Sequence, residues 1–248
     1  MNIEGCRVLI TGGAHRVGRE IANVLGSAGA ILAIHAHTSI DEGKCLVDEL
    51  NEREGAQSFL LQGDVTKLPD WRAMSEVMEE KWDALDVLVH NASVFSACPF
   101  EDSTDQDWDY FMSVNARAIF TGTRELLPLL RKSTLGRVIV IGDVAGELIW
   151  PSYIPYAVSK AAALALVKGL AQALAPDILV NAVSPGPVLF PEQASREEKE
   201  KAVANTLLKR SGSPTDIANA VRYLIEQGDY VTGQNIRVDG GRSAKHFC

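Results

Sequence analysis

Residues 7–18, RVLITGGAHRVG, decide the fold of this 248-residue chain. A short apolar run leads into a glycine turn, which passes directly into the helical pattern REIANVLGSAG. Strand, glycine-rich turn and helix form the arrangement in which backbone N–H groups and a helix N-terminus bind a dinucleotide phosphate. The residues expected to contact such a cofactor are Gly12, Arg16, Val17 and Gly18. The spacing departs from Gly-x-Gly-x-x-Gly, so alone it also fits an ordinary turn, a methyltransferase or a sugar-nucleotide enzyme.

Further segments outward from this turn alternate between strand and helix patterns. Strands are expected at 7–11, 30–36, 57–61, 85–90, 136–142, 178–183 and 235–239, and helices at 41–53, 69–82, 107–130, around Tyr156 and at 214–228. This alternation predicts an α/β fold, a single-domain Rossmann-type doubly wound parallel sheet of about seven strands with helices on both faces. No linker divides residues 1–248, so we expect one dinucleotide-binding catalytic domain. The mixed Pro, Glu, Lys and Arg composition of 187–212 favours a mobile lid over the substrate.

The composition narrows the classes of partner. The chain has 24 Lys and Arg against 32 Asp and Glu, a formal net charge of −8. Nucleic acids and anionic membranes attract basic surfaces, so we expect neither, and a small-molecule substrate is favoured. No basic region with a long apolar run, and no stretch of about 18 uncharged apolar residues, indicates a membrane segment, so a cytoplasmic protein is expected. The scattered cysteines predict free thiols and no metal site: Cys6, Cys45, Cys98 and Cys248.

The residues after the second strand bear on the choice of cofactor. An NAD site places an acidic residue here to bind the ribose 2′-hydroxyl, and that residue would repel a 2′-phosphate. This chain has His37, Thr38 and Ser39 instead, and Arg16 adds a fixed positive charge, so NADP(H) is favoured over NAD(H). His35 and His37 alternate along the strand, so their rings should face opposite sides and not share a metal.

Other candidate site residues follow the remaining strands, because ligands of open parallel sheets bind beyond the carboxyl ends of the strands. Asp64 and Val65 are expected near the adenine. The run Asn91-Ala92-Ser93 should face the cofactor, and Phe95 fits either a stacking platform or the core. Asn115 lies inside an apolar helix pattern, where it needs a partner, and it is a candidate for holding a water or a backbone group near the site.

Tyr156 and Lys160 are four residues apart, so both side chains lie on one face of a helix. A cation this close should lower the pKa of the phenol from about 10 and make it a usable proton donor. The pair alone is more often a buried tyrosine beside a solvated lysine, so the other motifs must decide its role. Asp143 ends the strand at 136–142, where a nicotinamide ring is expected.

Taken together, six motifs resemble the single-domain short-chain dehydrogenase/reductase family over essentially the whole chain. They are Thr11-Gly12-x-x-x-Arg16-x-Gly18, Asn91-Ala92, Asn115, Tyr156-x-x-x-Lys160, Pro185-Gly186, and Gly233-Gln234 with Val238-Asp239-Gly240-Gly241. The resemblance implies a nicotinamide cofactor, contacts to it from Ser93, Tyr156, Lys160, Pro185 and Gly186, and catalytic roles for Asn115, Tyr156 and Lys160. Relatives form tetramers through the helix after the tyrosine, so a homo-oligomer, a tetramer, is expected.

One departure from the family is informative. Its members usually carry a serine thirteen residues before the catalytic tyrosine, where this chain has Asp143. An ionised carboxylate would oppose charge development on a ketone oxygen, whereas reduction of a C=N bond, whose nitrogen receives a proton, is compatible with it. Asp143 would then join the catalytic set.

The same substitution resembles pteridine reductases, in which an aromatic ring sandwiches the pterin against the nicotinamide. The resemblance places Arg16, Ser93, Phe95, Asp143, Trp150, Tyr153 and Tyr156 in the substrate site. Thr38 replaces an arginine usual in that group, and the lid is short. We therefore expect an NADPH-dependent reductase of a pterin-like heterocycle. The alternatives are a reductase or dehydrogenase of another carbonyl or imine, and a non-catalytic NADP(H)-binding sensor or scaffold.

Overall fold

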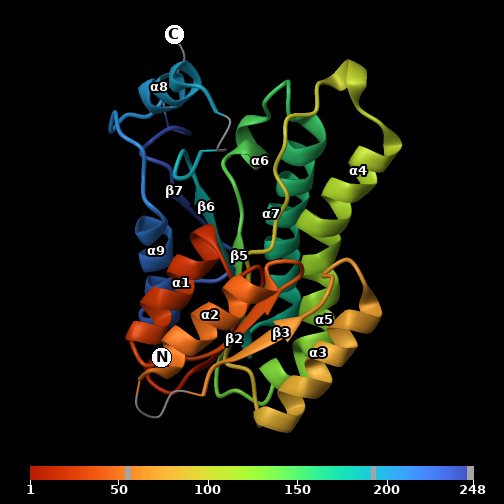
Figure 1. Ribbon diagram of the computed structural model, residues 1–248, viewed down its shortest axis with the longest axis vertical. Helices are drawn as coiled ribbons and strands as arrows, with labels where there is room; N and C mark the ends of the chain where they lie inside the picture. Colours follow the sequence, from red (N-terminus) through yellow and green to blue (C-terminus); the bar gives the residue numbers. More distant parts are fainter. Residues whose placement is uncertain (54–56, 191–193, 245–248) are drawn as a thin grey trace.

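The computed structural model describes residues 1–53, 57–190 and 194–244 (Figure 1). Its centre is a seven-stranded parallel sheet in the order β3-β2-β1-β4-β5-β6-β7, which confirms the predicted fold class. All seven predicted strands are present, with ends within two residues of those expected. The strands are β1 (Arg7–Ile10), β2 (Ile31–Ala36), β3 (Phe59–Gln62), β4 (Val87–His90), β5 (Gly136–Ile141), β6 (Ile178–Pro185) and β7 (Asn235–Val238).

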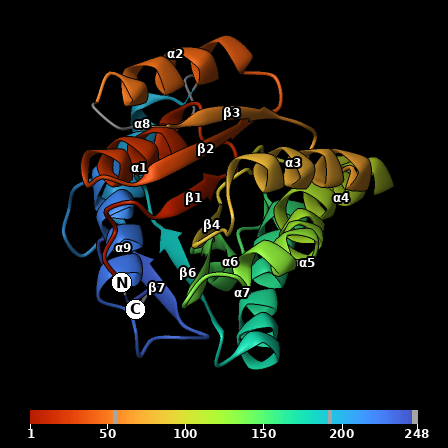
Figure 2. The same ribbon diagram turned by 90° about the horizontal axis from the view of Figure 1, so that it is seen from below.

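Helices cover both faces of the sheet, as Figure 2 shows. One face packs against α1, α2 and α9, and the other against α3, α5 and α7. The helices are α1 (Arg16–Ser27), α2 (Ile40–Asn51), α3 (Leu68–Lys81), α4 (Asp105–Met112), α5 (Ala118–Leu130), α6 (Ala145–Leu148), α7 (Ile154–Leu174), α8 (Arg196–Ala204) and α9 (Pro214–Glu226), with short turns at η1 (Phe100–Asp102) and η2 (Ser113–Arg117).

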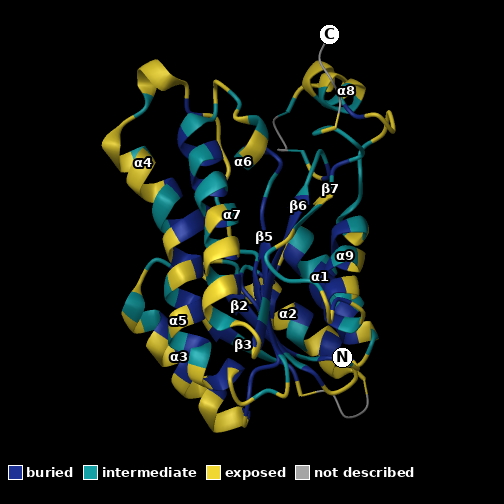
Figure 3. Ribbon diagram, turned by 180° about the vertical axis from the view of Figure 1, so that it is seen from behind, coloured by how far each residue is buried: buried dark blue, intermediate teal, exposed yellow. Residues whose placement is uncertain are grey.

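Side-chain alternation along the strands explains these two layers. Val8 and Ile10 of β1 pack with α1, whereas Leu9 between them packs on the α3 side. Successive side chains of a strand point to opposite faces, and a strand covered on both faces is therefore apolar throughout. The burial colouring of Figure 3 shows the central strands in the buried class. Because all neighbouring strands pair in parallel, their carboxyl ends meet at one edge of the sheet.

Two regions differ from the sequence prediction. The helix expected at 107–130 is divided into α4, a π-helical turn at Ser113–Arg117, and α5. The proposed lid contains a helix that the composition did not indicate, α8, which begins with a capping box between Ser195 and Glu198. Part of that lid, 191–193, lies outside the described residues, as does Cys248. Cys6, Cys45 and Cys98 are free thiols, as predicted.

Helix α7 is long and apolar enough, by length and composition alone, to cross a membrane, with a mean hydropathy of 1.3. It is the one such helix among the described residues. Its buried side chains, Ala163, Val167 and Ala171 among them, pack against the sheet in the same core cluster as Val180 of β6. The apolar side chains on this face of α7 therefore cover the sheet.

Candidate active site

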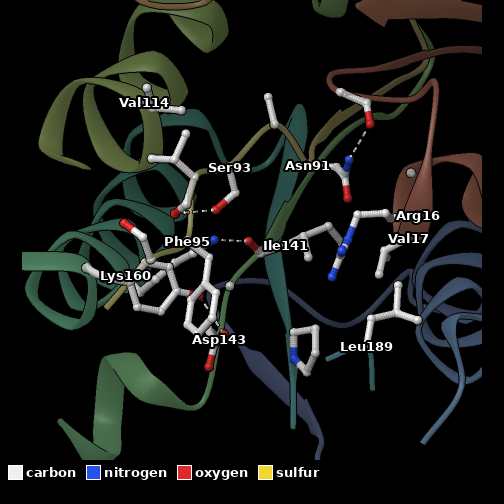
Figure 4. Close-up of a pocket in the computed structure, with 18 of the residues that line it drawn as sticks. Arg16, Val17, Asn91, Ser93, Phe95, Val114, Ile141, Asp143, Lys160 and Leu189 are labelled. Carbon is white, nitrogen blue, oxygen red and sulfur yellow. Dashed lines mark hydrogen bonds between the residues drawn. The ribbon is translucent and has the colours of Figure 1, made fainter. Parts of the chain in front are cut away.

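A cleft of about 1570 Å³ lies at the carboxyl edge of the sheet. Every site residue proposed from the sequence lines it except Asn115, which lies behind its wall. Figure 4 shows the two ends of this cleft: Arg16 and Val17 lie at one end, and Phe95, Asp143 and Lys160 lie together at the other. We refer to them as the glycine-turn end and the tyrosine end.

Close backbone contacts shape the glycine-turn end. Gly12 has a φ of +60°, and a Cβ added there would lie 3.0 Å from Cα of Ala92. A Cβ on Gly18 would lie only 2.3 Å from the carbonyl oxygen of Gly12. The Asn91 amide donates hydrogen bonds to the carbonyl oxygens of Thr11 and Gly12, at 3.0 and 2.8 Å. These contacts hold the turn against the end of β4, and they require glycine at both positions.

The side chain of His35, on β2, stabilises the same turn. Its Nδ1 accepts a hydrogen bond from the Gly12 N–H at 3.1 Å, so Nε2 must carry the proton, and Nε2 lies 3.0 Å from the Gly63 carbonyl oxygen. Burial lowers the pKa of His35 and keeps the ring neutral, as this arrangement needs. Sequence reasoning assigned His35 only an alternating place on the strand. Within the described chain, no three His, Cys, Asp or Glu side chains gather as metal ligands.

The N-terminus of α1 faces the cleft, and no side chain caps it. His15 at the N-cap makes no side-chain capping bond, and the first turn holds no acidic residue. Arg16 begins the helix with a φ of +54° and lines the cleft. Free N–H groups at a helix N-terminus attract an anion such as a phosphate.

Polar residues beyond β2 and β3 complete this end. His37, Thr38 and Ser39 line it, and none of the three is acidic. The Asp64 carboxylate, proposed for adenine, accepts hydrogen bonds from the N–H and hydroxyl of Thr66 through Oδ1, at 2.9 and 2.8 Å. One oxygen of the Asp64 carboxylate is therefore already used in stabilising the turn that contains it.

At the tyrosine end, Asp143 and Tyr156 form a direct contact. The Tyr156 hydroxyl donates a hydrogen bond to Oδ2 of Asp143 at 2.6 Å, and the Ala145 N–H donates to Oδ1 at 2.7 Å. The Lys160 ammonium donates to the Ile141 carbonyl oxygen at 3.1 Å and lies 5.9 Å from the centre of the Tyr156 ring. The chain thus brings a buried carboxyl, a phenol and an ammonium together.

Burial governs the proton affinities of these three groups. It raises the pKa of Asp143, against the opposing effects of the Tyr156 and Ala145 hydrogen bonds and the Lys160 charge. It lowers the pKa of Lys160 to about 8, which the Asp143 charge partly counteracts. The pKa of Tyr156 is raised well above 10, by burial first and then by the Asp143 carboxylate. The prediction that Lys160 lowers the tyrosine pKa is therefore wrong here, because a carboxylate beside the hydroxyl disfavours the phenolate.

Asn115 is fully satisfied inside the π-helical turn. Its amide donates to the Val94 carbonyl oxygen and the Ser159 hydroxyl, at 3.1 and 3.0 Å. Its carbonyl oxygen accepts from the Val94 N–H and the Ser93 hydroxyl, both at 3.0 Å. All four hydrogen-bonding positions of the side chain are used. Asn115 therefore fixes the backbone that carries Ser93 and Phe95, whereas a water held by its side chain would have to displace one of these partners.

Aromatic rings form one wall of the tyrosine end. Phe95 stacks on Tyr153 with ring centres 5.1 Å apart, and it meets the Tyr156 ring edge-on at 4.9 Å. Trp150 contacts Tyr153 at 5.8 Å, and the Arg242 guanidinium lies 4.9 Å above the Trp150 ring. Sequence reasoning missed Arg242. The available signal was its place just after Gly240-Gly241, beyond the carboxyl end of the last strand.

Pro185 and Gly186 close the floor of the cleft between β6 and β7. A Cβ on Gly186 would lie 2.6 Å from Cα of Asp239, so these strand ends approach closely only with glycine there.

The family model described as Enoyl-(Acyl carrier protein) reductase matches residues 12–243. The chain belongs to the short-chain dehydrogenase/reductase family. It is accordingly an NAD(P)H-dependent oxidoreductase of that family.

Two curated relatives illustrate the range within the short-chain dehydrogenase/reductase family. Nodulation protein G of Rhizobium meliloti (strain 1021) is 33% identical over 243 residues, which cover 96% of this chain and 97% of that protein. The 3-oxoacyl-[acyl-carrier-protein] reductase FabG of Staphylococcus aureus is 32% identical over 237 residues, covering 94% of this chain and 96% of FabG.

Solved structures of the family agree with the fold at similar identity. FolM alternative dihydrofolate reductase 1 from Brucella canis, complexed with NADP, superposes with a TM-score of 0.92 at 31% identity, covering 100% of this chain and 97% of that one. A blue fluorescent protein from a metagenomic library, in complex with NADPH, gives a TM-score of 0.91 at 31% identity, with 98% and 100% coverage.

Proposed function

We propose that the protein is an NADPH-dependent reductase of a pterin-like heterocycle. The observation that carries this proposal is the 2.6 Å hydrogen bond from the Tyr156 hydroxyl to the Asp143 carboxylate. A carboxylate in this place would lie beside a ketone oxygen as that oxygen gains negative charge, and would raise the barrier. Reduction of a C=N bond develops its charge on a nitrogen that accepts a proton, so the same carboxylate is tolerated.

In this reaction the carbon of the C=N bond receives a hydride and its nitrogen receives a proton, leaving a C–N single bond and an N–H bond. NADPH supplies the hydride. Tyr156 gives the proton, and Asp143 orients its hydroxyl. Lys160 supplies the positive charge that the phenol needs as its proton leaves. Asn115 positions the segment from Ser93 to Phe95 through four hydrogen bonds.

The glycine-turn end fits NADP(H) better than NAD(H). The open N-terminus of α1 suits the pyrophosphate, and Asn91, Ala92, Ser93, Pro185 and Gly186 lie along the path toward Asp143. The three residues directly after β2, His37, Thr38 and Ser39, include no carboxylate to bind the 2′-hydroxyl. Arg16 lines the cleft together with His37, Thr38 and Ser39, and its fixed positive charge compensates for the neutral Thr38. The NADP and NADPH complexes of the two structural relatives support this choice.

The aromatic wall supports a flat substrate. Phe95 is 44% exposed, and Tyr153 occupies one of its faces. Its other face is left to stack on a planar ring, with Trp150 and Tyr153 extending the wall. The relative from Brucella canis carries the name of a dihydrofolate reductase, whose substrate contains a pterin ring. Arg16 and Ser93 lie at the same cleft and complete the proposed substrate contacts.

The second candidate is a ketone reductase with Asp143 in place of the family serine. The 32% identity to a 3-oxoacyl-[acyl-carrier-protein] reductase favours it. Oxidation of NADPH should be measured with dihydrobiopterin, dihydrofolate, quinonoid analogues and simple ketones. Turnover of ketones alone would reject the heterocycle proposal, and tight NADPH binding without any turnover would indicate a sensor or scaffold.

Replacing Asp143 with serine separates the two candidates further. Under our proposal, Asp143→Ser lowers kcat for the heterocycle by about 100-fold, since the proton donor loses its orienting partner. The exposed Asp83→Ser outside the cleft is the matched control. A gain of ketone activity without loss of heterocycle activity would favour the second candidate.

We further propose a cytoplasmic homotetramer in which residues 187–212 act as a lid. The lid is supported by Leu189 and Lys201, which line the cleft. The oligomer is supported by large apolar side chains that lie exposed on α4 and α5, with Trp108 at 44% and Phe120 at 46% exposure, and that burial in an oligomer would cover. Light scattering should give four times the 26.8 kDa mass, and a monomer would contradict the oligomer.

A further inference from the structure

The segment after β7 places an arginine at the tyrosine end of the cleft. The Asp239 carboxylate accepts hydrogen bonds from the N–H groups of Gly241 and Ser243, at 2.8 and 2.7 Å. Gly240 and Gly241 both have positive φ, +62° and +79°, so the chain turns sharply there. This turn directs the half-buried Arg242 side chain into the cleft wall.

A continuous row of rings connects Arg242 with the proposed proton donor. The row runs from Tyr156 through Phe95, Tyr153 and Trp150 to the guanidinium, with neighbouring centres 4.9 to 5.8 Å apart. A guanidinium within about 6 Å of an indole ring is held by a cation–π interaction. Among the described residues, none accepts a side-chain hydrogen bond from Arg242, so the N–H groups of the guanidinium are available to a ligand. Within residues 1–53, 57–190 and 194–244, no carboxylate lies within ion-pair distance of it.

The charge of the cleft is opposite to that of the whole protein. The described lining contains six Lys and Arg side chains against four Asp and Glu, whereas the chain as a whole has a formal charge of −8. Arg16 and Lys67 belong to the glycine-turn end, near the expected cofactor phosphates. Arg242 stands at the end of the aromatic row instead, so its charge faces the substrate. An acidic protein with a basic cleft selects anionic ligands.

We propose that Arg242 binds a carboxylate on the side chain of the substrate, so that the enzyme prefers pteridines whose substituent is aromatic and ends in a carboxylate. This inference rests on the proposed function. The pterin ring would lie at Phe95 and Tyr156, the aromatic part of the substituent would follow Tyr153 and Trp150, and the carboxylate would accept hydrogen bonds from Arg242. An arginine fork matches the two oxygens of a carboxylate, which makes the recognition specific for that group.

Two substrates that share a pterin ring test the proposal. Dihydrofolate carries an aromatic substituent with carboxylates, and dihydrobiopterin carries a short neutral one. In Arg242→Gln, the ratio of kcat/KM for dihydrofolate to that for dihydrobiopterin should fall about tenfold or more, mainly through KM of dihydrofolate. Arg242→Lys should retain part of the preference, because it keeps the charge and loses the fork. Arg72→Gln, an exposed arginine paired with Glu125 outside the cleft, should leave the ratio unchanged.

A binding measurement separates this inference from the proposed reaction. Calorimetric titration with folic acid, which carries the same substituent, should give a Kd about tenfold higher for Arg242→Gln than for the wild type. If neither pteridine is reduced but this difference in Kd is found, the proposed function fails and the anion site stands. If both pteridines are reduced and the ratio and the Kd are unchanged in Arg242→Gln, the carboxylate site is overturned.

Discussion

The two ends of the cleft depend on different parts of the chain, the first on backbone contacts and the second on side chains. The glycine-turn end depends on backbone geometry, where one extra Cβ on Gly12 or Gly18 would collide with neighbouring main chain. The tyrosine end depends on side chains from separate segments, including Phe95 after β4, Asp143 after β5 and Arg242 after β7. The glycine turn of the first end lies within one stretch of sequence, although His35 and Asn91 support it from neighbouring strands. The second end exists only after the sheet has brought its strand ends together.

This difference separates the part of the cleft suited to cofactor binding from the part proposed to carry out the reaction. Backbone groups at the glycine-turn end can bind a cofactor whatever reaction follows, which agrees with the varied names of the relatives. Under the proposed function, side chains at the tyrosine end determine which double bond is reduced. Substitutions at the tyrosine end should therefore change turnover and substrate choice, and substitutions at the glycine-turn end should change stability and cofactor affinity.

The largest effect is expected from removing the phenolic hydroxyl. Tyr156→Phe should lower kcat by about 1000-fold, since it removes the hydroxyl that we propose as the proton donor. Affinity for NADPH, measured by fluorescence titration, should change much less than kcat. The fully exposed Tyr230→Phe serves as the control and should keep wild-type kcat. Retention of a tenth or more of the activity in Tyr156→Phe would show that the proton comes from elsewhere.

A smaller effect, confined to stability and cofactor binding, is expected at the glycine turn. In Gly18→Ala the new Cβ would lie 2.3 Å from the Gly12 oxygen and 2.9 Å from the Gly13 Cα, both backbone atoms. The free energy of unfolding should fall by about 2 to 3 kcal/mol, measured by urea denaturation, and NADPH affinity should fall with it.

Gly169→Ala is the matched control for that substitution. Apart from the neighbouring backbone of its own helix, no described atom lies within 4 Å of a Cβ built on Gly169, which is exposed inside α7. This variant should gain about 0.5 to 1 kcal/mol, because alanine favours the helix. Equal stability of the two alanine variants would contradict the close packing of the turn.

Arg16 tests whether the glycine-turn end distinguishes the two cofactors. Arg16→Gln should raise the Kd for NADPH about tenfold and change the Kd for NADH little, because only NADPH carries the 2′-phosphate. Arg19→Gln is a control on the same helix, where the arginine pairs with Glu49 at 2.6 Å. Equal weakening of both cofactors would place Arg16 at the pyrophosphate instead, and the preference for NADPH would need another source.

The sequence was most informative where structure is local. The apolar runs predicted every strand, and the i, i+4 spacing correctly put Tyr156 and Lys160 beside each other. The turn around Gly12 was also readable, although the supporting bond from the Gly12 N–H to His35 was not. That bond joins residues 23 positions apart, and only the pairing of β1 with β2 brings them together.

The features that the sequence did not predict depend on tertiary packing or on burial. Arg242 is far from Trp150 in sequence, and β7 reaches the tyrosine end only because it pairs with β6. The π-helical turn at Asn115 arises where its side chain binds the Val94 backbone, which no pattern in the helix reveals. The direction of the Tyr156 pKa was mispredicted because burial and the Asp143 carboxylate both raise it.

The smallest predicted effect concerns the balance between Asp143 and Lys160 at the tyrosine end. Burial lowers the pKa of Lys160 to about 8, so the side chain is an ammonium below that pH and loses its charge as the pH rises through it. The value of kcat/KM, which reports the free enzyme, should therefore fall to about half of its plateau near pH 8 and continue to fall above it. The Asp143 charge raises the pKa of Lys160, so Asp143→Asn should move this alkaline decline to lower pH even as it lowers the rate. Profiles that decline at the same pH in both proteins, or at higher pH in the variant, would show that the two buried groups do not act on each other as their geometry indicates.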